Sequence, residues 1–154
     1  MTTTASDSPF RAEQNTDDSI KASLSLLESM LDEAADHLFD ADYFEEIGRE
    51  LRRLHARIRM HHAADYVGAS PDDPNALPPE LSEELNRLRA EHPLFLGQLD
   101  RLVRSVDAMA DRSLEDKEVF ILRARELIAM LRRHEAEEDR LFYLAVWRDT
   151  GGES

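Results

Sequence analysis

Long runs of apolar residues at alternating steps of three and four positions constrain the fold of this chain more than any other feature. Such steps place all members of a run on one face of an α-helix. The runs are Ile20, Leu24, Leu27, Leu31, Ala34 and Leu38; Phe44, Ile47, Leu51, Leu54, Ile58, His61 and Asp65; Leu81, Leu85, Leu88, His92, Phe95, Leu99, Leu102, Val106 and Met109; and Phe120, Ala124, Leu127, Leu131, His134, Glu138, Leu141 and Ala145. This pattern predicts four amphipathic helices around one core.

Changes in composition divide the chain into one folded region and two tails. Residues 1–17 are rich in Thr, Ser and Asp and show no periodicity, so we expect a disordered N-terminal tail. The proline-rich stretch 68–79 is expected to be a loop. Short connections imply antiparallel neighbours. The predicted fold class is therefore all-α, an up-down-up-down antiparallel four-helix bundle over residues 18–148, followed by a short tail at 149–154.

Local signals indicate where the helices begin and where one of them is perturbed. The first helix is expected to begin at Asp18, and Asp42 and Ser113 are the expected caps of the second and fourth helices. Pro93 directly follows His92 and removes a backbone N–H group in the third helix, which predicts a kink. Two short helices are the alternative, but the apolar stripe continues unbroken past Pro93 and favours the kink.

Composition and charge exclude several classes of function. The chain has 154 residues, enough for one domain, and a net charge of −14 that disfavours nucleic acids and anionic membrane surfaces. It contains no cysteine, so disulfides, thiol chemistry and zinc–thiolate sites are excluded. No apolar run has the length of a membrane span and no secretory pattern is present, so we expect a cytoplasmic protein.

Five ionisable residues lie on stripes that should otherwise be apolar: His61, Asp65, His92, His134 and Glu138. Burying such groups is costly unless they are paired, and a metal ion is a partner suited to all of them. Imidazole combined with carboxylate favours iron, manganese or zinc over calcium. The two carboxylates can bridge two ions or complete the ligand set of one. The alternatives without a metal are an internal ion pair between His61 and Asp65, another between His134 and Glu138, and for His92 a core histidine with its hydrogen bonds satisfied.

The three histidines are expected to lie at one level of the bundle. A helix rises about 1.5 Å per residue, and His92 and His134 lie about twenty residues on either side of the turn near Arg112. His61 lies about twenty residues from the turn that precedes its own helix. At the matching level the stripe of the first helix offers only apolar residues. A ferritin-like site is excluded, because no Glu precedes any of these histidines by three positions.

Three segments resemble the helix 2, helix 3 and helix 4 motifs of hemerythrin-like proteins: HHAAD at 61–65, LRAEH at 88–92 and HEAEEDRL at 134–141. The resemblance extends over residues 19–148. It implies a non-haem di-iron centre that binds dioxygen, or that senses or detoxifies dioxygen, nitric oxide or peroxide. Oxygen-carrying members place the helix 4 carboxylate five residues after its histidine, which nominates Asp139 as a reserve ligand, whereas the stripe favours Glu138.

Two hypotheses for the function follow from these residues. The first is an iron-binding protein that uses His61, Asp65, His92, His134 and Glu138 to hold two ions, or one ion in a degenerate centre, with a small diatomic ligand as its partner. The second is a metal-free bundle that acts as an interaction or structural protein, motivated by the missing histidine on the first helix and by Asp in place of the usual Glu. No separate acid, base or nucleophile constellation is present, so we predict no catalytic residues.

Overall fold

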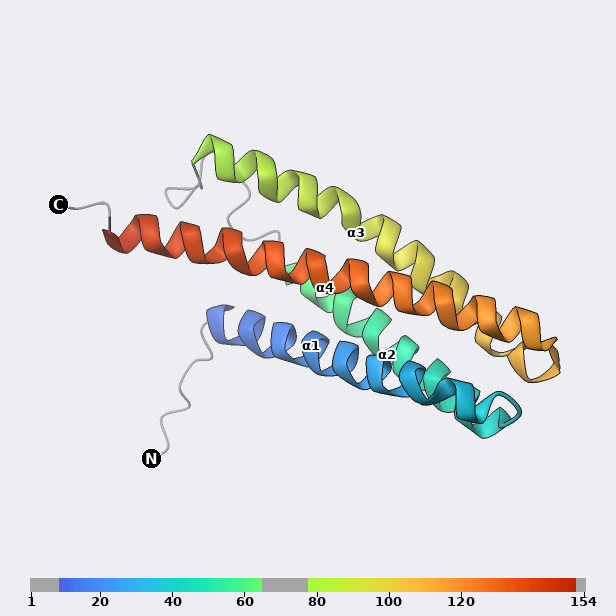
Figure 1. The fold of residues 1–154 in the computed structure, drawn as a ribbon. Helices are drawn as coiled ribbons and strands as arrows, with labels where there is room; N and C mark the ends of the chain where they lie inside the picture. Colours follow the sequence, from blue (N-terminus) through green and yellow to red (C-terminus); the bar gives the residue numbers. More distant parts are fainter. Residues whose placement is uncertain (1–8, 65–77, 152–154) are drawn as a thin grey trace, which may run out of the picture.

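The computed structural model describes the backbone of residues 9–64 and 78–151. Its four α-helices are α1 (Pro9–Glu33), α2 (Ala41–Ala64), α3 (Pro79–Val106) and α4 (Leu114–Gly151), with short 3₁₀ helices at Ala34–His37 and Met109–Asp111. Consecutive helices pack side by side, and α1 also packs on α4 (Figure 1). The all-α four-helix bundle with antiparallel neighbours is therefore confirmed. No helix in these two stretches has the length and apolar character needed to cross a membrane.

The core consists of the apolar stripes that the sequence predicts. Its main cluster extends along the bundle from the two turns toward the level of the histidines, and a smaller cluster lies beyond that level. The main cluster contains Ile20, Leu24, Leu27, Leu31, Phe44, Ile47, Leu51, Leu54, Ile58, Phe95, Leu99, Leu102, Val106, Met109, Phe120, Ala124, Leu127, Ile128 and Leu131. Each helix therefore buries one face, as expected for an amphipathic bundle.

Two of the expected helix starts differ from the structure. α1 begins at Pro9 rather than at Asp18, because proline is favoured in the first turn and no helix breaker follows it. Asp40, not Asp42, caps α2: its Oδ1 accepts hydrogen bonds from the backbone N–H groups of Asp42 and Tyr43 at 3.1 and 3.3 Å. α2 begins at Ala41, earlier than the apolar stripe indicates, so its capping residue lies two positions before the expected one.

The other local predictions agree better with the structure. Ser113 caps α4, where its Oγ accepts a hydrogen bond from the backbone N–H of Asp116 at 3.2 Å. α3 passes through Pro93 as one helix, so the alternative of two short helices is wrong. α4 continues to Gly151, a few residues further than expected.

α2 and α3 approach each other closely at Gly48. A Cβ atom at this position would lie 2.8 Å from Cγ1 of Val106, whereas nothing lies within 4 Å of a Cβ at Gly97. A contact of 2.8 Å is shorter than packed carbon atoms tolerate. The absence of a side chain at Gly48 therefore permits the close packing of these two helices below the level of the histidines.

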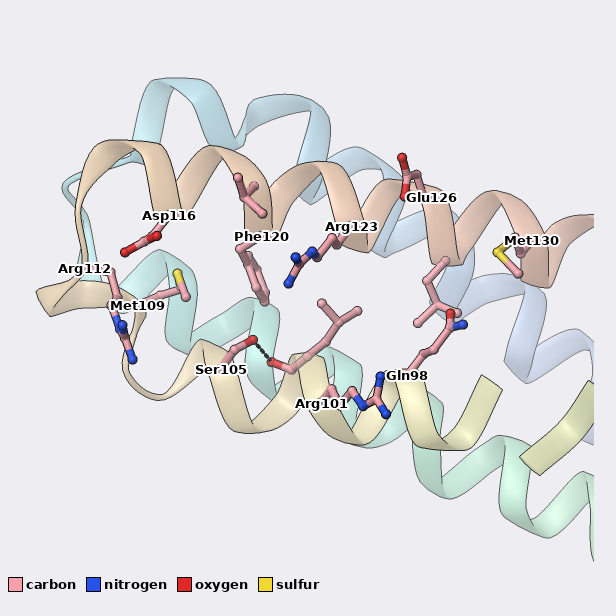
Figure 2. A pocket seen from close by; sticks show the side chains of 13 residues that line it. Gln98, Arg101, Ser105, Met109, Arg112, Asp116, Phe120, Arg123, Glu126 and Met130 are labelled. Atoms are coloured by element: carbon pink, nitrogen blue, oxygen red, sulfur yellow. Dashed lines mark hydrogen bonds between the residues drawn. The ribbon is translucent and has the colours of Figure 1, made fainter. Parts of the chain in front are cut away.

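A groove opens between α3 and α4 on the side of their connecting turn (Figure 2). It has a volume of about 590 Å³, and Leu102, Phe120 and Leu127 contribute to its floor. We refer to it as the α3–α4 groove. It lies on the outside of the bundle and is distinct from the histidine cluster in the core.

Candidate metal centre

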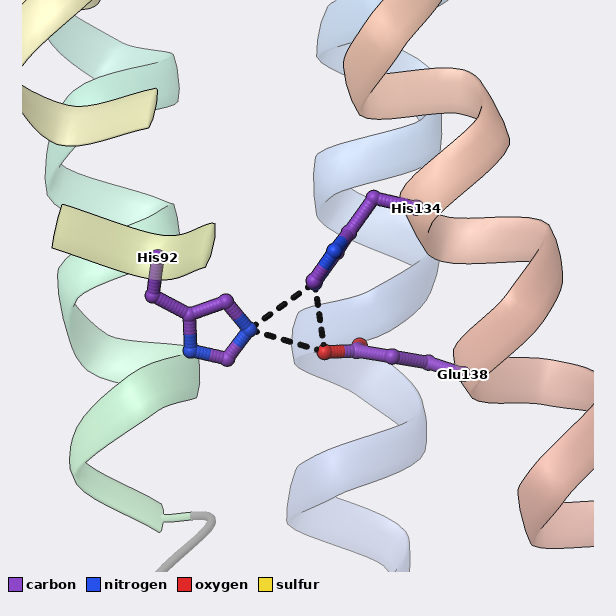
Figure 3. A group of neighbouring side chains, drawn as sticks. All are labelled: His92, His134 and Glu138. Atoms are coloured by element: carbon purple, nitrogen blue, oxygen red, sulfur yellow. Dashed lines mark hydrogen bonds and ion pairs between the residues drawn. The ribbon is translucent and has the colours of Figure 1, made fainter. Parts of the chain in front are cut away.

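Three histidines from three helices converge on one carboxylate inside the bundle. His61 of α2, His92 of α3 and His134 of α4 are 7, 6 and 5% exposed. Figure 3 shows His92 pointing across the interior toward His134 and Glu138. The helical rise predicted this common level, and the structure brings these four side chains together as expected.

The carboxylate of Glu138 contacts all three imidazole rings through both of its oxygens. Oε1 lies 2.8 Å from Nε2 of His134 and 3.0 Å from Nε2 of His92, and those two nitrogens are 2.8 Å apart. Oε2 lies 3.0 Å from Nε2 of His61. One carboxylate therefore joins a pair of histidines on one side to a single histidine on the other.

Protons alone cannot satisfy the triangle formed by Glu138 Oε1 and the Nε2 atoms of His92 and His134. An ionised carboxylate oxygen only accepts hydrogen bonds, and each imidazole nitrogen offers at most one hydrogen. If both nitrogens donate to Glu138, two N–H groups face each other across 2.8 Å. If either nitrogen is deprotonated, its lone pair faces another acceptor. A cation that attracts all three lone pairs removes this conflict, so the residues present fit a metal ion.

A second group of donors shares Glu138 with the first. His61, Glu135 and Glu138 each offer a ligand atom, and these atoms all lie within 4.8 Å of one another, as do those of His92, His134 and Glu138. Glu135 belongs to α4 and is 5% exposed. Because each oxygen of Glu138 faces a different group, this carboxylate can contribute a ligand atom to both groups.

Sequence reasoning missed Glu135, and one of its predicted ligands cannot be placed. Asp65 lies outside the residues that the structure describes. Glu135 follows the buried Ile128 and Leu131 at steps of seven and four. The buried face of α4 therefore includes a second row of residues, Ile128 and Glu135, beside the predicted stripe. The sequence signal for a ligand at this position was an acidic residue seven positions after an apolar one.

Asp139 points away from the centre. Its Oδ2 accepts a hydrogen bond from Nζ of Lys21 at 2.7 Å, in an ion pair whose two side chains are 37 and 45% exposed. This contact joins α4 to α1 at the level where the first helix was expected to offer no ligand. Asp139, the reserve ligand, thus forms a surface ion pair, and Glu138 is the carboxylate that faces the core.

A further carboxylate holds the second nitrogen of His134. Nδ1 of His134 lies 2.9 Å from Oε2 of Glu91, the residue before His92 on α3. This contact fixes the orientation of the ring and directs Nε2 toward the centre, which is how carboxylates commonly support metal-binding histidines. Phe95 packs edge-on against the same ring at 5.1 Å between centroids. The position of His134 is therefore set from two sides.

The charges of the centre are strongly coupled. Burial alone raises the pKa of Glu138, but the hydrogen bonds from His134, His61 and His92 outweigh burial and hold this pKa well below its usual range. Burial lowers the pKa of His134, but the hydrogen bonds and charges of Glu138 and Glu91 outweigh it and raise this pKa above 6.5. The carboxylate is therefore ionised at neutral pH and is available as a ligand.

The bundle thus contains buried groups of histidine and glutamate that can hold a metal ion. Comparisons of this chain with models of protein families, with curated proteins and with solved structures found no match.

Proposed function

We propose that this protein binds iron at the buried centre formed by His92, His134, Glu138 and His61. The observation that carries the proposal is the triangle of two imidazole nitrogens and one carboxylate oxygen, with sides of 2.8, 2.8 and 3.0 Å. Ligands about 2.1 Å from an ion are about 3.0 Å apart at right angles and about 3.4 Å apart in a tetrahedron. The observed spacing supports a six-coordinate ion, and two histidines with one carboxylate are typical of non-haem iron(II).

The arrangement of Glu138 favours two ions over one. His92 and His134 would hold the first ion with Oε1 of Glu138, and His61 and Glu135 would hold the second with Oε2. Asp65, four residues after His61 in the sequence, is a further candidate ligand for the second ion. Glu91 would orient His134 by accepting a hydrogen bond from its Nδ1. Glu135 would take the place of the histidine that the resemblance to hemerythrin-like proteins implies on α1.

We further propose that the centre binds a small molecule such as dioxygen, nitric oxide or peroxide. Bound iron would supply a redox-active Lewis acid with a coordination position open to such a ligand. Apolar side chains flank the centre along the bundle: the main apolar cluster lies on one side, and Leu81, Leu88 and Leu141 lie on the other. Reversible binding, sensing and reduction all remain within this proposal.

Iron content after anaerobic loading and desalting tests the proposal. We expect about two irons per chain, and about one in Glu135→Gln, because the second position loses a charged ligand. His134→Ala removes a ligand of the first position, so its iron content should also fall below that of the wild-type protein. His37→Ala is the matched control, because His37 stacks on Tyr43 near the α1–α2 turn. A folded wild-type protein that retains no iron would refute the proposal.

One observation favours the second candidate function, a metal-free bundle. Glu138 already has hydrogen-bond partners on three helices, so the cluster offsets much of its own charge without an ion. A chelator distinguishes the two functions. Unfolding of the iron-loaded protein should shift to higher temperature than that of the chelated protein, since a ligand that binds only the folded state stabilises it. Identical unfolding curves would favour the metal-free bundle.

A further inference from the structure

The α3–α4 groove is lined by more positive than negative side chains, although the chain as a whole is acidic. Arg101, Arg112 and Arg123 line it, together with the two carboxylates of Asp116 and Glu126. All three arginines are exposed, and among the described residues none of them forms an ion pair. The whole chain has a net charge of −14. The groove is therefore a local site where anionic groups are attracted to a surface that otherwise repels them.

Arginines elsewhere on the bundle behave differently. Arg125, Arg132 and Arg140 of α4 pair with Asp32, Glu28 and Glu84 of neighbouring helices at 3.2, 2.7 and 2.9 Å. Those guanidinium groups help to hold the helices together. The three arginines of the groove have no such role within the described part of the chain, so their donors are available to an external carboxylate.

Apolar side chains complete the surface of the groove. Val119, Arg123, Glu126 and Met130 follow one another on α4 at steps of four, three and four, and so lie on one stripe. Val119 and Met130 are 40 and 41% exposed and lie at the two ends of this stripe. The α4 side of the groove therefore offers apolar contacts at both ends and a guanidinium group near the middle.

We propose that the α3–α4 groove docks an acidic amphipathic helix of a partner protein. From Asp116 to Met130 the α4 side extends about 21 Å, which is about four turns of a helix. A helix lying in a groove between two others buries apolar side chains at steps of three and four. Acidic residues beside that apolar face would meet Arg101, Arg112 and Arg123, whose planar guanidinium groups suit carboxylates. The proposal does not depend on metal binding.

The charges argue against a second copy of the chain as the occupant. Figure 2 shows Arg123 reaching from α4 into the groove and Arg101 lying along its α3 side. A two-fold dimer pairs one patch with itself, and this patch holds three guanidinium groups but only two carboxylates, so such a dimer would leave one guanidinium of each copy without a carboxylate. The partner helix must instead supply the opposite charge.

Two synthetic peptides provide the test. One is an 18-residue helical peptide with Leu at steps of three and four and Glu beside the apolar face, and the other has Lys in place of each Glu. Each carries a fluorophore, and its anisotropy is measured against the full chain. We expect the Glu peptide to bind at least about tenfold more tightly than the Lys peptide, because each guanidinium–carboxylate contact is charge-assisted.

Variants locate the binding surface. Arg101→Glu with Arg123→Glu should weaken binding of the Glu peptide at least about tenfold. Arg87→Glu is the matched control, because Arg87 is also exposed on α3 and lies outside the groove; it should leave the affinity unchanged. Circular dichroism establishes that both variants fold.

Four outcomes would overturn the proposal. The first is that neither peptide binds, or that both bind equally well. The second is an equal loss of affinity in the Arg87 control and in the groove variant. The third is a dimer seen by sedimentation that Arg123→Glu dissociates, which would assign the groove to a second copy. Inorganic phosphate that competes at the same concentration as the peptide would also count against a helix.

Discussion

Replacing Glu138 by Gln tests the electrostatic account of the centre, because the two side chains have nearly the same size but differ in charge. Three imidazole nitrogens lie 2.8 to 3.0 Å from the carboxylate. A hydrogen bond to a charged group contributes about 1.5–3 kcal/mol, and one between neutral groups about 0.5–1.5 kcal/mol. Because His92 and His134 cannot both donate to Oε1, two bonds count, one from His61 and one from that pair, and loss of the charge should cost about 1 kcal/mol per bond and about 2 kcal/mol in all.

Urea unfolding in the presence of a chelator measures this cost without a contribution from metal. The measurement belongs between pH 4.5 and 6.5, the ordinary pKa values of Glu138 and His134. In this window the lowered pKa of the carboxylate and the raised pKa of the imidazole both favour the folded state. We expect the free energy of unfolding to fall by about 2 kcal/mol and the melting temperature by about 7 °C.

Glu137→Gln is the control, since Glu137 is the neighbouring residue and is only half-buried. Its replacement should change the free energy of unfolding by less than about 0.5 kcal/mol. The reasoning is refuted if Glu138→Gln is no less stable than this control. Desolvation of the carboxylate would then cancel its attraction to the histidines, as it does in some buried ion pairs.

Three further predictions concern pH, the support of His134 and helix packing. In the metal-free protein, the stabilisation from the raised pKa of His134 is complete below pH 6.5 and is lost as the pH rises through the raised value, which thermal unfolding across a pH series measures. Glu91→Gln should weaken iron binding about tenfold in a competition with a coloured chelator, because the ring loses its charged acceptor. Gly97→Ala should raise the free energy of unfolding by about 1 kcal/mol, the usual gain from removing a helical glycine. Gly48→Ala should lower it by about 1–2 kcal/mol, because the contact with Val106 overpacks the core; equal effects at the two glycines would contradict this packing argument.

Periodicity predicted the bundle well because burial on one helix face leaves a direct trace in the sequence. The stripe residues from Ile20 to Leu31 and from Phe44 to His61 are all buried. The level of the histidines followed from the constant rise of a helix, which needs no tertiary information. The predicted helix ends were less accurate, because a cap depends on local backbone geometry, and several acidic residues near a helix start can serve as the cap.

Buried charges outside the main stripes were not predictable in the same way. Glu50 is 4% exposed because Oγ of Ser23 donates to it at 2.8 Å and Arg53 lies 3.2 Å away. Nothing in the spacing of α2 distinguishes Glu50 from the exposed acidic residues around it. Glu135 is a similar case on α4. Both positions border a stripe, and only the rotation of the packed helices decides whether they face the core or the solvent.

The hydrogen bonds that stabilise the metal-free centre also oppose the binding of a cation. An imidazole coordinates only after its Nε2 has lost its proton, so metal binding releases protons. The raised pKa of His134 makes this loss more costly at neutral pH, whereas the lowered pKa of Glu138 keeps the carboxylate ready to coordinate. Iron affinity should therefore increase over the same pH range in which the stability of the metal-free protein decreases. If iron affinity and stability change in opposite directions with the same midpoint pH, both changes are due to the proton on His134. If a separate group controlled one of them, the two midpoints would differ.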